Sequence, residues 1–536
     1  MENEEIKKEN TTTSNGLLKS AGLIMIVILL SKIFGFLRDV IVANYYGASI
    51  VSDAYFYAYQ IPALAVVILG GMGGPFHSAT VSVFSKLVTD FKAKPEPEVK
   101  KLFNTFETFS MIIFGIIALI CFFFPEQVMN IIISQATPEL SSLAAKHLQI
   151  MSPVILVGAL LGLYYGILVT YNKFLLPNIA PSALSLGIIL TLFFSSGDKN
   201  GYYLALGTTI GALIQLVMQS PAVLKLGYTF KPSFDFFHNK NFNDILELLM
   251  PAFLSSTIGQ IGIYVDIFFA SGLPEGQWTA YGYANRIFQF PVGLMLSALL
   301  VPLFPLFSRL VAKKDFDSVR HYFNKGVGSL ILVGTYLMIF IFISGLDLIS
   351  IALERGAFTH EAAIMVFEVL FMISLSIIPY VFRDSITRLY YSFNDSKTPF
   401  FIAIGSIALK LIFNSIFVRL LGIQGIALST AIITTINATL LAILIRKKIS
   451  IGYRAFLGQV VKIVICAVAA FLFGIILERL LAMALPYTFI FKIIKVTIIF
   501  FFTSAIYVAL AHIFKVEYLE DVKEKIMAKF SKKIGL

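Results

Sequence analysis

A short pattern occurs twice in this chain, and its repetition constrains the fold more than any other feature of the sequence. The matching segments are Ala54-Tyr55-Phe56-Tyr57-Ala58 and Ala280-Tyr281-Gly282-Tyr283-Ala284, Phe84-Ser85-Lys86-Leu87 and Phe307-Ser308-Arg309-Leu310, and Tyr171-Asn172 and Phe393-Asn394. The three offsets of 226, 223 and 222 residues nearly agree. Matches at one near-constant spacing predict two copies of one helical module. Duplicated bundles with a cavity between the copies are a common architecture of membrane transporters.

The composition places both copies in a membrane. Hydrophobic residues make up 58% of the 536 residues and charged residues only 14%, whereas a soluble chain carries about 25% charged residues. A membrane-crossing helix needs about 20 mostly apolar residues. On that basis we predict fourteen spans, near 17–37, 53–74, 103–124, 147–170, 177–195, 202–222, 246–270, 281–303, 326–345, 363–388, 399–418, 424–445, 457–477 and 489–513.

The charges of the loops predict the orientation of the spans. Cytoplasmic loops of membrane proteins are enriched in Lys and Arg. With the N-terminus in the cytoplasm, the predicted inner segments hold thirty Lys and Arg residues and the outer loops hold six. We therefore expect both termini in the cytoplasm. The net charge of +11 then follows from insertion beside anionic lipid. It does not indicate nucleic-acid binding, which would need a soluble basic domain with aromatic platforms.

The order of the spans predicts an all-α polytopic membrane protein with five segments. These are a disordered cytoplasmic tail at 1–16, an N-lobe of spans 1–6 at 17–222, a C-lobe of spans 7–12 at 245–445, spans 13 and 14 at 457–513, and a basic amphipathic cytoplasmic tail at 515–536. Because six spans, an even number, separate the starts of the two copies, we expect parallel six-helix repeats around a central cavity. The extra C-terminal pair either covers a lipid-facing surface or forms a groove for a lipid tail. We expect a monomer.

Charged residues inside the predicted spans are functional candidates. Each costs at least about 2.5 kcal/mol at mid-membrane and so needs a partner or a wet cavity. Lys32 and Arg38 belong to span 1, Asp53 opens span 2, and Arg286 belongs to span 8. Arg38 can pair with the adjacent Asp39 near the outer surface, and Lys32 and Arg286 can reach the interface or a partner on another helix. The interpretation we favour is a cationic cavity wall for an anionic substrate.

Two motifs resemble a known family. The segment Ser31-Lys32-Ile33-Phe34-Gly35-Phe36-Leu37-Arg38-Asp39 with Asp53-Ala54-Tyr55-Phe56, and the segment Tyr283-Ala284-Asn285-Arg286-Ile287, resemble the MurJ/MviN lipid II flippases of the MOP exporter superfamily. The similarity extends over essentially the whole chain. It implies a transporter that carries lipid-linked peptidoglycan precursor from the inner to the outer leaflet of the bacterial cytoplasmic membrane by alternating access. It also implies that Lys32, Arg38 and Arg286 line a central cavity, with Asp53 at an acidic position of the family.

The chain departs from the family pattern in and after span 2. A pair of arginines that often follows the span-2 proline is replaced by Val66 and Val67. A glycine-rich stretch follows, which could act as a hinge or offer backbone N–H groups to a phosphate, and its glycines are Gly70, Gly71, Gly73 and Gly74. His77 could join these donors, or it could be a structural, hydrogen-bonded histidine. At position 32 Lys replaces the usual Arg, which keeps the charge and loses the two-pronged geometry for a diphosphate.

The resemblance also implies a candidate cation site in the second lobe. Asp266, Asn414 and Thr434 match positions that bind sodium in some family members, while the expected second acid corresponds to Val418. The alternative is that Asp266 pairs within its lobe or carries a proton. The coupling source is therefore Na+, H+ or the membrane potential, and we expect no other cofactor. The sequence contains no P-loop pattern and only two cysteines, both in apolar segments, so neither ATP nor a Cys-rich metal site is predicted.

The remaining charges do not indicate an active site. A membrane enzyme would need a substantial external loop with an acid or histidine pair, yet the predicted outer loops are short, and Asp347 and Glu354 form no recognisable acid/base pair. Arg383, Asp384 and Arg388 in span 10 have a spacing suited to pairing with one another. The alternative function is a related exporter of another polyprenyl-linked oligosaccharide, of the O-antigen type.

Overall fold

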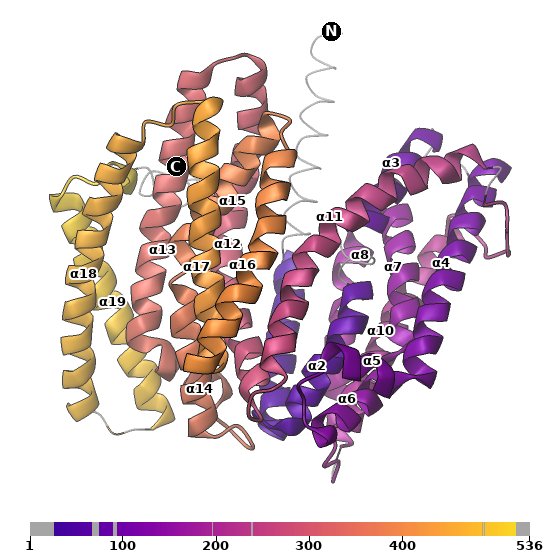
Figure 1. Ribbon diagram of the computed structural model, residues 1–536, viewed down its shortest axis with the longest axis horizontal. Helices are drawn as coiled ribbons and strands as arrows, with labels where there is room; N and C mark the ends of the chain where they lie inside the picture. The colour runs from indigo at the N-terminus through magenta and orange to yellow at the C-terminus, as the bar shows by residue number, and fades with distance from the viewer. Residues whose placement is uncertain are drawn as a thin grey trace, which may run out of the picture. The chain divides into compact units, whose positions relative to one another are not determined.

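The computed structural model describes residues 26–66, 74–88, 94–195, 197–236, 239–484, 486 and 488–520 (Figure 1). Within these residues the regular elements are all helices, as predicted. The predicted N-terminal tail at 1–16 lies outside the described residues, as does most of the predicted C-terminal tail, from 521 onward.

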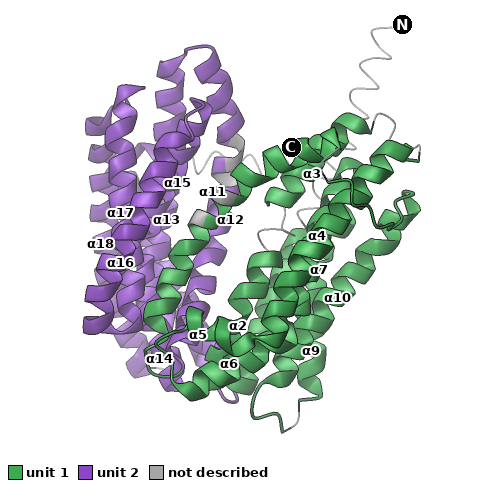
Figure 2. Ribbon diagram, turned by 45° about the vertical axis from the view of Figure 1, so that its right-hand side comes forward, with its two compact units in different colours: residues 1–275 green, residues 276–536 purple. Residues whose placement is uncertain are grey.

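The chain forms two compact units, Met1–Glu275 and Gly276–Leu536 (Figure 2). The first unit contains a helix over 26–46, followed by α2 (Ile50–Leu64), α3 (Pro75–Leu87), α4 (Pro97–Phe123), α5 (Pro125–Ile132), α6 (Pro138–Met151), α7 (Pro153–Thr170), α8 (Leu175–Ile179), α9 (Ser182–Phe193), α10 (Tyr202–Lys225) and α11 (Lys240–Ala270). We had predicted that the helix over 246–270 opens the second lobe. It corresponds to α11, which packs against α3, α4 and α5 and so belongs by its contacts to the first unit.

The second unit begins with α12 and ends after the C-terminal helix pair. Its helices are α12 (Gln277–Ala312), α13 (Phe316–Leu353), α14 (His360–Ser374), α15 (Ile377–Ser392), α16 (Lys397–Leu421), α17 (Ile423–Leu444), the 3-10 helix η2 (Ile445–Lys447), α18 (Tyr453–Ala484) and α19 (Phe489–Ile513). The extra pair α18 and α19 packs against α13. The hydroxyl of Tyr507 on α19 donates to the backbone oxygen of Leu332 on α13 at 2.9 Å.

Nine helices in the described part of the chain are long and apolar enough to cross a membrane. The bent pair α14 and α15, whose axes meet at 46°, would make a tenth. The other four predicted spans are 17–37, 53–74, 246–270 and 281–303, which are the first two of each repeat. Each of them contains residues or side chains outside the described set. The total of fourteen therefore stays a prediction.

Prolines set several helix boundaries. The helices α4, α5, α6 and α7 each begin with proline, at Pro97, Pro125, Pro138 and Pro153. A proline at the first helical position loses no hydrogen bond, but it cannot continue a helix that precedes it. The predicted span at 147–170 is therefore two helices that meet at Ser152.

The repeated motif occupies the core of both units. Ala54 and Ala58 on α2, and their counterparts Ala280 and Ala284 on α12, are fully buried. Four aromatic residues of the repeat are likewise at most 2% exposed, namely Tyr57, Tyr283, Phe84 and Phe307. Alanine on these faces allows neighbouring helices to approach closely. The repeat in the sequence is thus a repeat of core positions.

The two copies differ in their helices on the C-terminal side of the repeated Ala-Tyr motif. In the first copy α2 ends at Leu64 and α3 begins at Pro75, with Gly74 as the N-cap, whereas the matching part of the second copy is the single helix α12. Gly70, Gly71 and Gly73 lie outside the described residues, as does Val67. A hinge at this stretch stays a prediction.

Candidate functional site

The helix over 26–46 carries the first two basic candidates. Ser31 anchors this helix to its own unit, because its hydroxyl donates to the backbone oxygen of Asn178 at 3.1 Å and lies 2.8 Å from the hydroxyl of Ser182. The next residue, Lys32, is exposed on the surface of the unit and makes no ion pair with another described residue. The side chain of Lys32 is therefore accessible to a ligand.

Arg38 forms the ion pair that its neighbour in the sequence suggested. Its Nε and Nη2 atoms both donate to Oδ1 of Asp39, at 3.0 Å and 2.8 Å. Both side chains are largely buried. A guanidinium has five N–H donors, and the pair uses two of them. The geometry therefore supports the structural interpretation of Arg38 and leaves donors for an anionic ligand.

Asp53 and His77 lie on two different helices of the first unit, α2 and α3. Asp53 is 2% exposed in the first turn of α2, where a negative charge is favoured by the helix dipole. His77 is in the first turn of α3 and packs edge-on against Tyr165 of α7, with ring centroids 4.7 Å apart. These contacts within the unit favour a structural role for His77.

Arg286 is the basic candidate of the second unit. It is half-buried on α12, and its Cζ atom lies 5.8 Å from the ring centroid of Tyr283, within cation–π range. Tyr283 is a buried tyrosine of the repeated motif, so Arg286 lies three positions after a core residue of its helix. The predicted site residues are thus divided, with Lys32, Arg38 and Asp53 in the first unit and Arg286 in the second. A shared cavity stays a prediction.

The three candidate cation ligands are all buried and are also divided between the units. Asp266 is 2% exposed on α11, Asn414 is fully buried on α16, and Thr434 is 4% exposed on α17. The helices α16 and α17 pack against each other, and the hydroxyl of Thr434 donates to the backbone oxygen of Thr430 at 2.7 Å. Among the described residues no group of three or more His, Cys, Asp or Glu residues could hold a metal ion. The candidate ligands therefore comprise one carboxylate, from Asp266, together with the amide of Asn414 and the hydroxyl of Thr434.

A buried ionic cluster in the second unit was not predicted from the sequence. Lys495 on α19 lies 2.7 Å from Oδ2 of Asp347 on α13 and 3.2 Å from Oε1 of Glu478 on α18. Lys492 lies one turn away, and its Nζ atom is 3.4 Å from Oε2 of Glu354 on α13. The signal was present in the sequence as two lysines three positions apart at the start of an apolar span. Their partners could not be assigned because they come from two other helices.

One ion pair among the charged residues of α15, between Arg388 and Asp384, forms as their spacing predicted. Nε of Arg388 donates to Oδ2 of Asp384, four positions earlier, at 3.3 Å. The Cζ atom of Arg383 lies 4.5 Å from the ring centroid of Tyr380. These contacts agree with a structural role for the three residues.

Comparison with known proteins identifies the family. The family model described as "Lipid II flippase MurJ" matches residues 42–514. A protein of Synechocystis sp. named "Probable lipid II flippase MurJ" is 29% identical, over 95% of this chain and 97% of its own. A protein of Aquifex aeolicus with the same name is 27% identical, over 84% of this chain and 87% of its own.

Solved structures agree with the sequence comparisons. A structure described as "Lipid II flippase MurJ, inward closed conformation" superposes with a TM-score of 0.74 at 26% identity and covers 90% of this chain and 98% of its own. An inward-facing multidrug resistance MATE transporter of the MOP superfamily has a TM-score of 0.61 at 14% identity, covers 80% of this chain and 98% of its own, and shares the fold. The chain is therefore a multi-pass membrane protein that belongs to the MurJ family of lipid II flippases.

Proposed function

We propose that this protein is a flippase that carries lipid II from the inner to the outer leaflet of the bacterial cytoplasmic membrane by alternating access. The observation that carries the proposal is the match of the MurJ family model to residues 42–514, together with a solved MurJ structure that aligns with 90% of the chain. The names of the curated relatives favour lipid II over an O-antigen-type oligosaccharide as the cargo.

The chemistry of the cargo explains the basic residues. A diphosphate head group with a sugar and a peptide cannot cross hydrocarbon cheaply, whereas its polyprenyl tail never needs to leave it. Lys32, Arg38 and Arg286 supply three cations within otherwise apolar spans. We expect them to line a wet chamber that shelters the head group. Lys32 acts there as a point charge, and the arginines offer directed pairs of N–H donors.

The proposal also covers the orientation of the chain in the membrane and the source of energy for transport. We infer that both termini lie in the cytoplasm, from the excess of Lys and Arg in the inner segments. An inside-negative potential then favours outward movement of a negative head group by about 2.3 kcal/mol per charge per 100 mV. Coupling to Na+ or H+ through Asp266, Asn414 and Thr434 is the alternative source. We expect the protein to act as a monomer.

A depletion-rescue experiment tests the cargo. The gene would be expressed in a bacterium whose own lipid II flippase is depleted, and lipid II in the outer leaflet would be measured by its accessibility to an impermeant reagent. We expect growth and outer-leaflet lipid II to be restored. Insertion of the full-length protein at normal levels with no outer-leaflet lipid II, while a known MurJ protein rescues the same strain, would reject lipid II as the cargo.

A further inference from the structure

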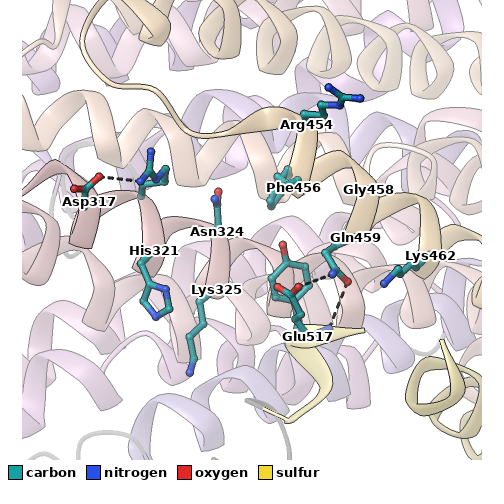
Figure 3. Close-up of a pocket in the computed structure, with 13 residues that line it drawn as sticks. Asp317, His321, Asn324, Lys325, Arg454, Phe456, Gly458, Gln459, Lys462 and Glu517 are labelled. Atoms are coloured by element: carbon teal, nitrogen blue, oxygen red, sulfur yellow. Dashed lines mark hydrogen bonds and ion pairs between the residues drawn. The ribbon is translucent and has the colours of Figure 1, made fainter. Parts of the chain in front are cut away.

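A hollow of about 680 Å³ lies within the second unit, at the beginning of α13 and α18 and beside the chain that follows α19 (Figure 3). Four basic side chains line it: Arg320, Lys325, Arg454 and Lys462. The two acids that also line it, Asp317 and Glu517, leave an excess of positive charge. The hollow lies at the end of the unit that the charges of the loops assign to the cytoplasm.

The acids of the hollow are already engaged. Oδ1 of Asp317 accepts from Nη2 of Arg320 at 2.8 Å, and Oε1 of Glu517 accepts from Nε2 of Gln459 at 2.8 Å (Figure 3). Arg454 and Lys462 make no ion pair with any residue that the structure describes. Arg454 and Lys462, which lie eight positions or about two turns apart on α18, therefore line a space in which no described acid pairs with them.

Polar groups and a glycine shape the hollow for a ligand. Nδ2 of Asn324 donates to the backbone oxygen of Ile451 at 2.9 Å, which fixes the orientation of the amide. Its Oδ1 atom is buried and accepts no hydrogen bond from the described residues. A Cβ atom added at Gly458, between Arg454 and Lys462 on α18, would meet no atom within 4 Å. The hollow thus offers cations for an anion and one acceptor for a hydroxyl group.

An apolar stripe leads away from the hollow along α18. Leu457 and Val461, next to Gly458 and Lys462, are 56% and 57% exposed. Further exposed residues continue the row at intervals of three or four along the helix, namely Val464, Val468, Leu472, Ile476 and Leu480. In a membrane protein such a row faces acyl chains. A ligand whose phosphate lies in the hollow therefore has a surface for its hydrocarbon part, which free phosphate would not use.

We propose that this hollow binds the head group of an anionic, hydroxylated phospholipid from the cytoplasmic leaflet. Arg454 and Lys462 hold the phosphate, Oδ1 of Asn324 accepts from a hydroxyl of the head group, and the acyl chains lie along the stripe of α18. Basic pockets at the cytoplasmic ends of membrane helices are a known means of binding anionic lipids. The site joins α13 to α18 and the chain after α19, so a bound lipid would link the C-terminal pair to the rest of its unit.

The test measures lipid binding to the full-length protein in neutral detergent by native mass spectrometry. The probes are phosphatidylglycerol, phosphatidylcholine and inorganic phosphate. We expect Arg454→Gln with Lys462→Gln to weaken phosphatidylglycerol binding about 25-fold, at about fivefold for each charge. A matched pair with the same change in charge, Lys313→Gln with Lys397→Gln, alters exposed lysines outside the hollow and should leave the affinity within about twofold.

A second variant tests the same site without removing charge, in case the Arg454/Lys462 variant does not fold. Gly458→Leu places a side chain into the open space without changing charge, and we expect it to weaken phosphatidylglycerol binding about as much as the double variant. Phosphatidylcholine should bind the protein and all variants equally. Equal phosphatidylglycerol affinity in the Arg454/Lys462 and Lys313/Lys397 variants, or displacement of the lipid by millimolar inorganic phosphate, would overturn the proposal.

Discussion

Asn172 and Asn394 lie 222 positions apart and adopt the same left-handed backbone conformation, with φ of 57° and 56°. Each closes a helix with the same two hydrogen bonds. The N–H of Asn172 donates to Val169 and that of Lys173 to Leu168, while the N–H of Asn394 donates to Tyr391 and that of Asp395 to Tyr390. This pattern is a Schellman motif. The duplication therefore extends to backbone conformation at the ends of α7 and α15.

The first prediction concerns these two caps. Replacing Asn172 or Asn394 by Ala should lower the free energy of unfolding by about 1 kcal/mol, since a side chain with a Cβ atom and no local polar group disfavours positive φ. Glycine at either position should be close to neutral. Thermal unfolding of the purified variants measures both effects. Equal losses for Ala and Gly would show that the asparagine side chain, and not the backbone, sets the stability of the turn.

The second prediction concerns the buried cluster of α13, α18 and α19. Lys495→Met should lower the free energy of unfolding by about 3 kcal/mol, because it leaves the carboxylates of Asp347 and Glu478 close together without their cation. Asp347→Asn should lower the free energy of unfolding by less, because Lys495 still has its ion pair with Glu478. The exposed pair of Asp317 and Arg320 is the control, and Asp317→Asn should cost less than about 1 kcal/mol. Similar melting temperatures for all three variants would contradict the assignment of a buried, stabilising cluster.

The third prediction concerns the contact between α9 and α10. A Cβ atom at Gly187 would lie 2.5 Å from the Cα atom of Gly211, so the two backbones touch. Gly187→Ala should lower stability by at least about 1–3 kcal/mol and reduce the yield of folded protein. Gly115→Ala on α4 is the matched control, because its Cβ atom would meet nothing within 4 Å. Size-exclusion profiles and melting temperatures of the two variants distinguish close packing from a general effect of losing a glycine.

The fourth prediction concerns pH. Partial burial acts to raise the pKa of Asp395, but hydrogen bonds from Thr398 and the ion pair with Lys448 at 3.2 Å outweigh it, so this pKa lies below its ordinary value. A lowered pKa stabilises the folded protein above the unfolded-state pKa, and this stability is lost as pH falls through the folded-state pKa. Asp395→Asn should therefore lower the melting temperature at pH 7. The difference from the unaltered protein should shrink below about pH 4. A difference that stays constant down to pH 3 would contradict this assignment.

The fifth prediction concerns transport. Arg286→Ala and Arg38→Ala should each abolish the appearance of lipid II in the outer leaflet in the depletion strain, with the protein still inserted. Arg38→Lys keeps the charge and should retain part of the activity, whereas Lys313→Ala, at an exposed loop position, should be fully active. Full activity of both alanine variants would reject the basic-chamber proposal. Loss of folded protein in Arg38→Ala alone would assign Arg38 to its ion pair with Asp39.

The sequence was sufficient to predict the all-α class and the duplication. The lengths of apolar segments and the repeated motifs are properties of local sequence. In the structure the apolar segments are helices, and repeated positions such as Ala54 and Ala280 are buried in the core. The pairing of Arg38 with Asp39 was also foreseen, because adjacent residues need no knowledge of the fold. The break at Ser152 was missed, although Pro153 marks it, because the apolar character of the segment continues through the break.

By itself, the sequence determined that this chain is a membrane protein, that it contains two copies of one module, and that it carries isolated charges within its spans. Tertiary structure alone decided which partners those charges have. Lys495 pairs with Asp347, 148 positions earlier, and the amide of Asn324 donates to the backbone oxygen of Ile451, because three helices distant in the chain pack together. An unpaired charge in hydrocarbon is costly, so each such charge requires a partner. Only the packing of helices determines which residue that partner is.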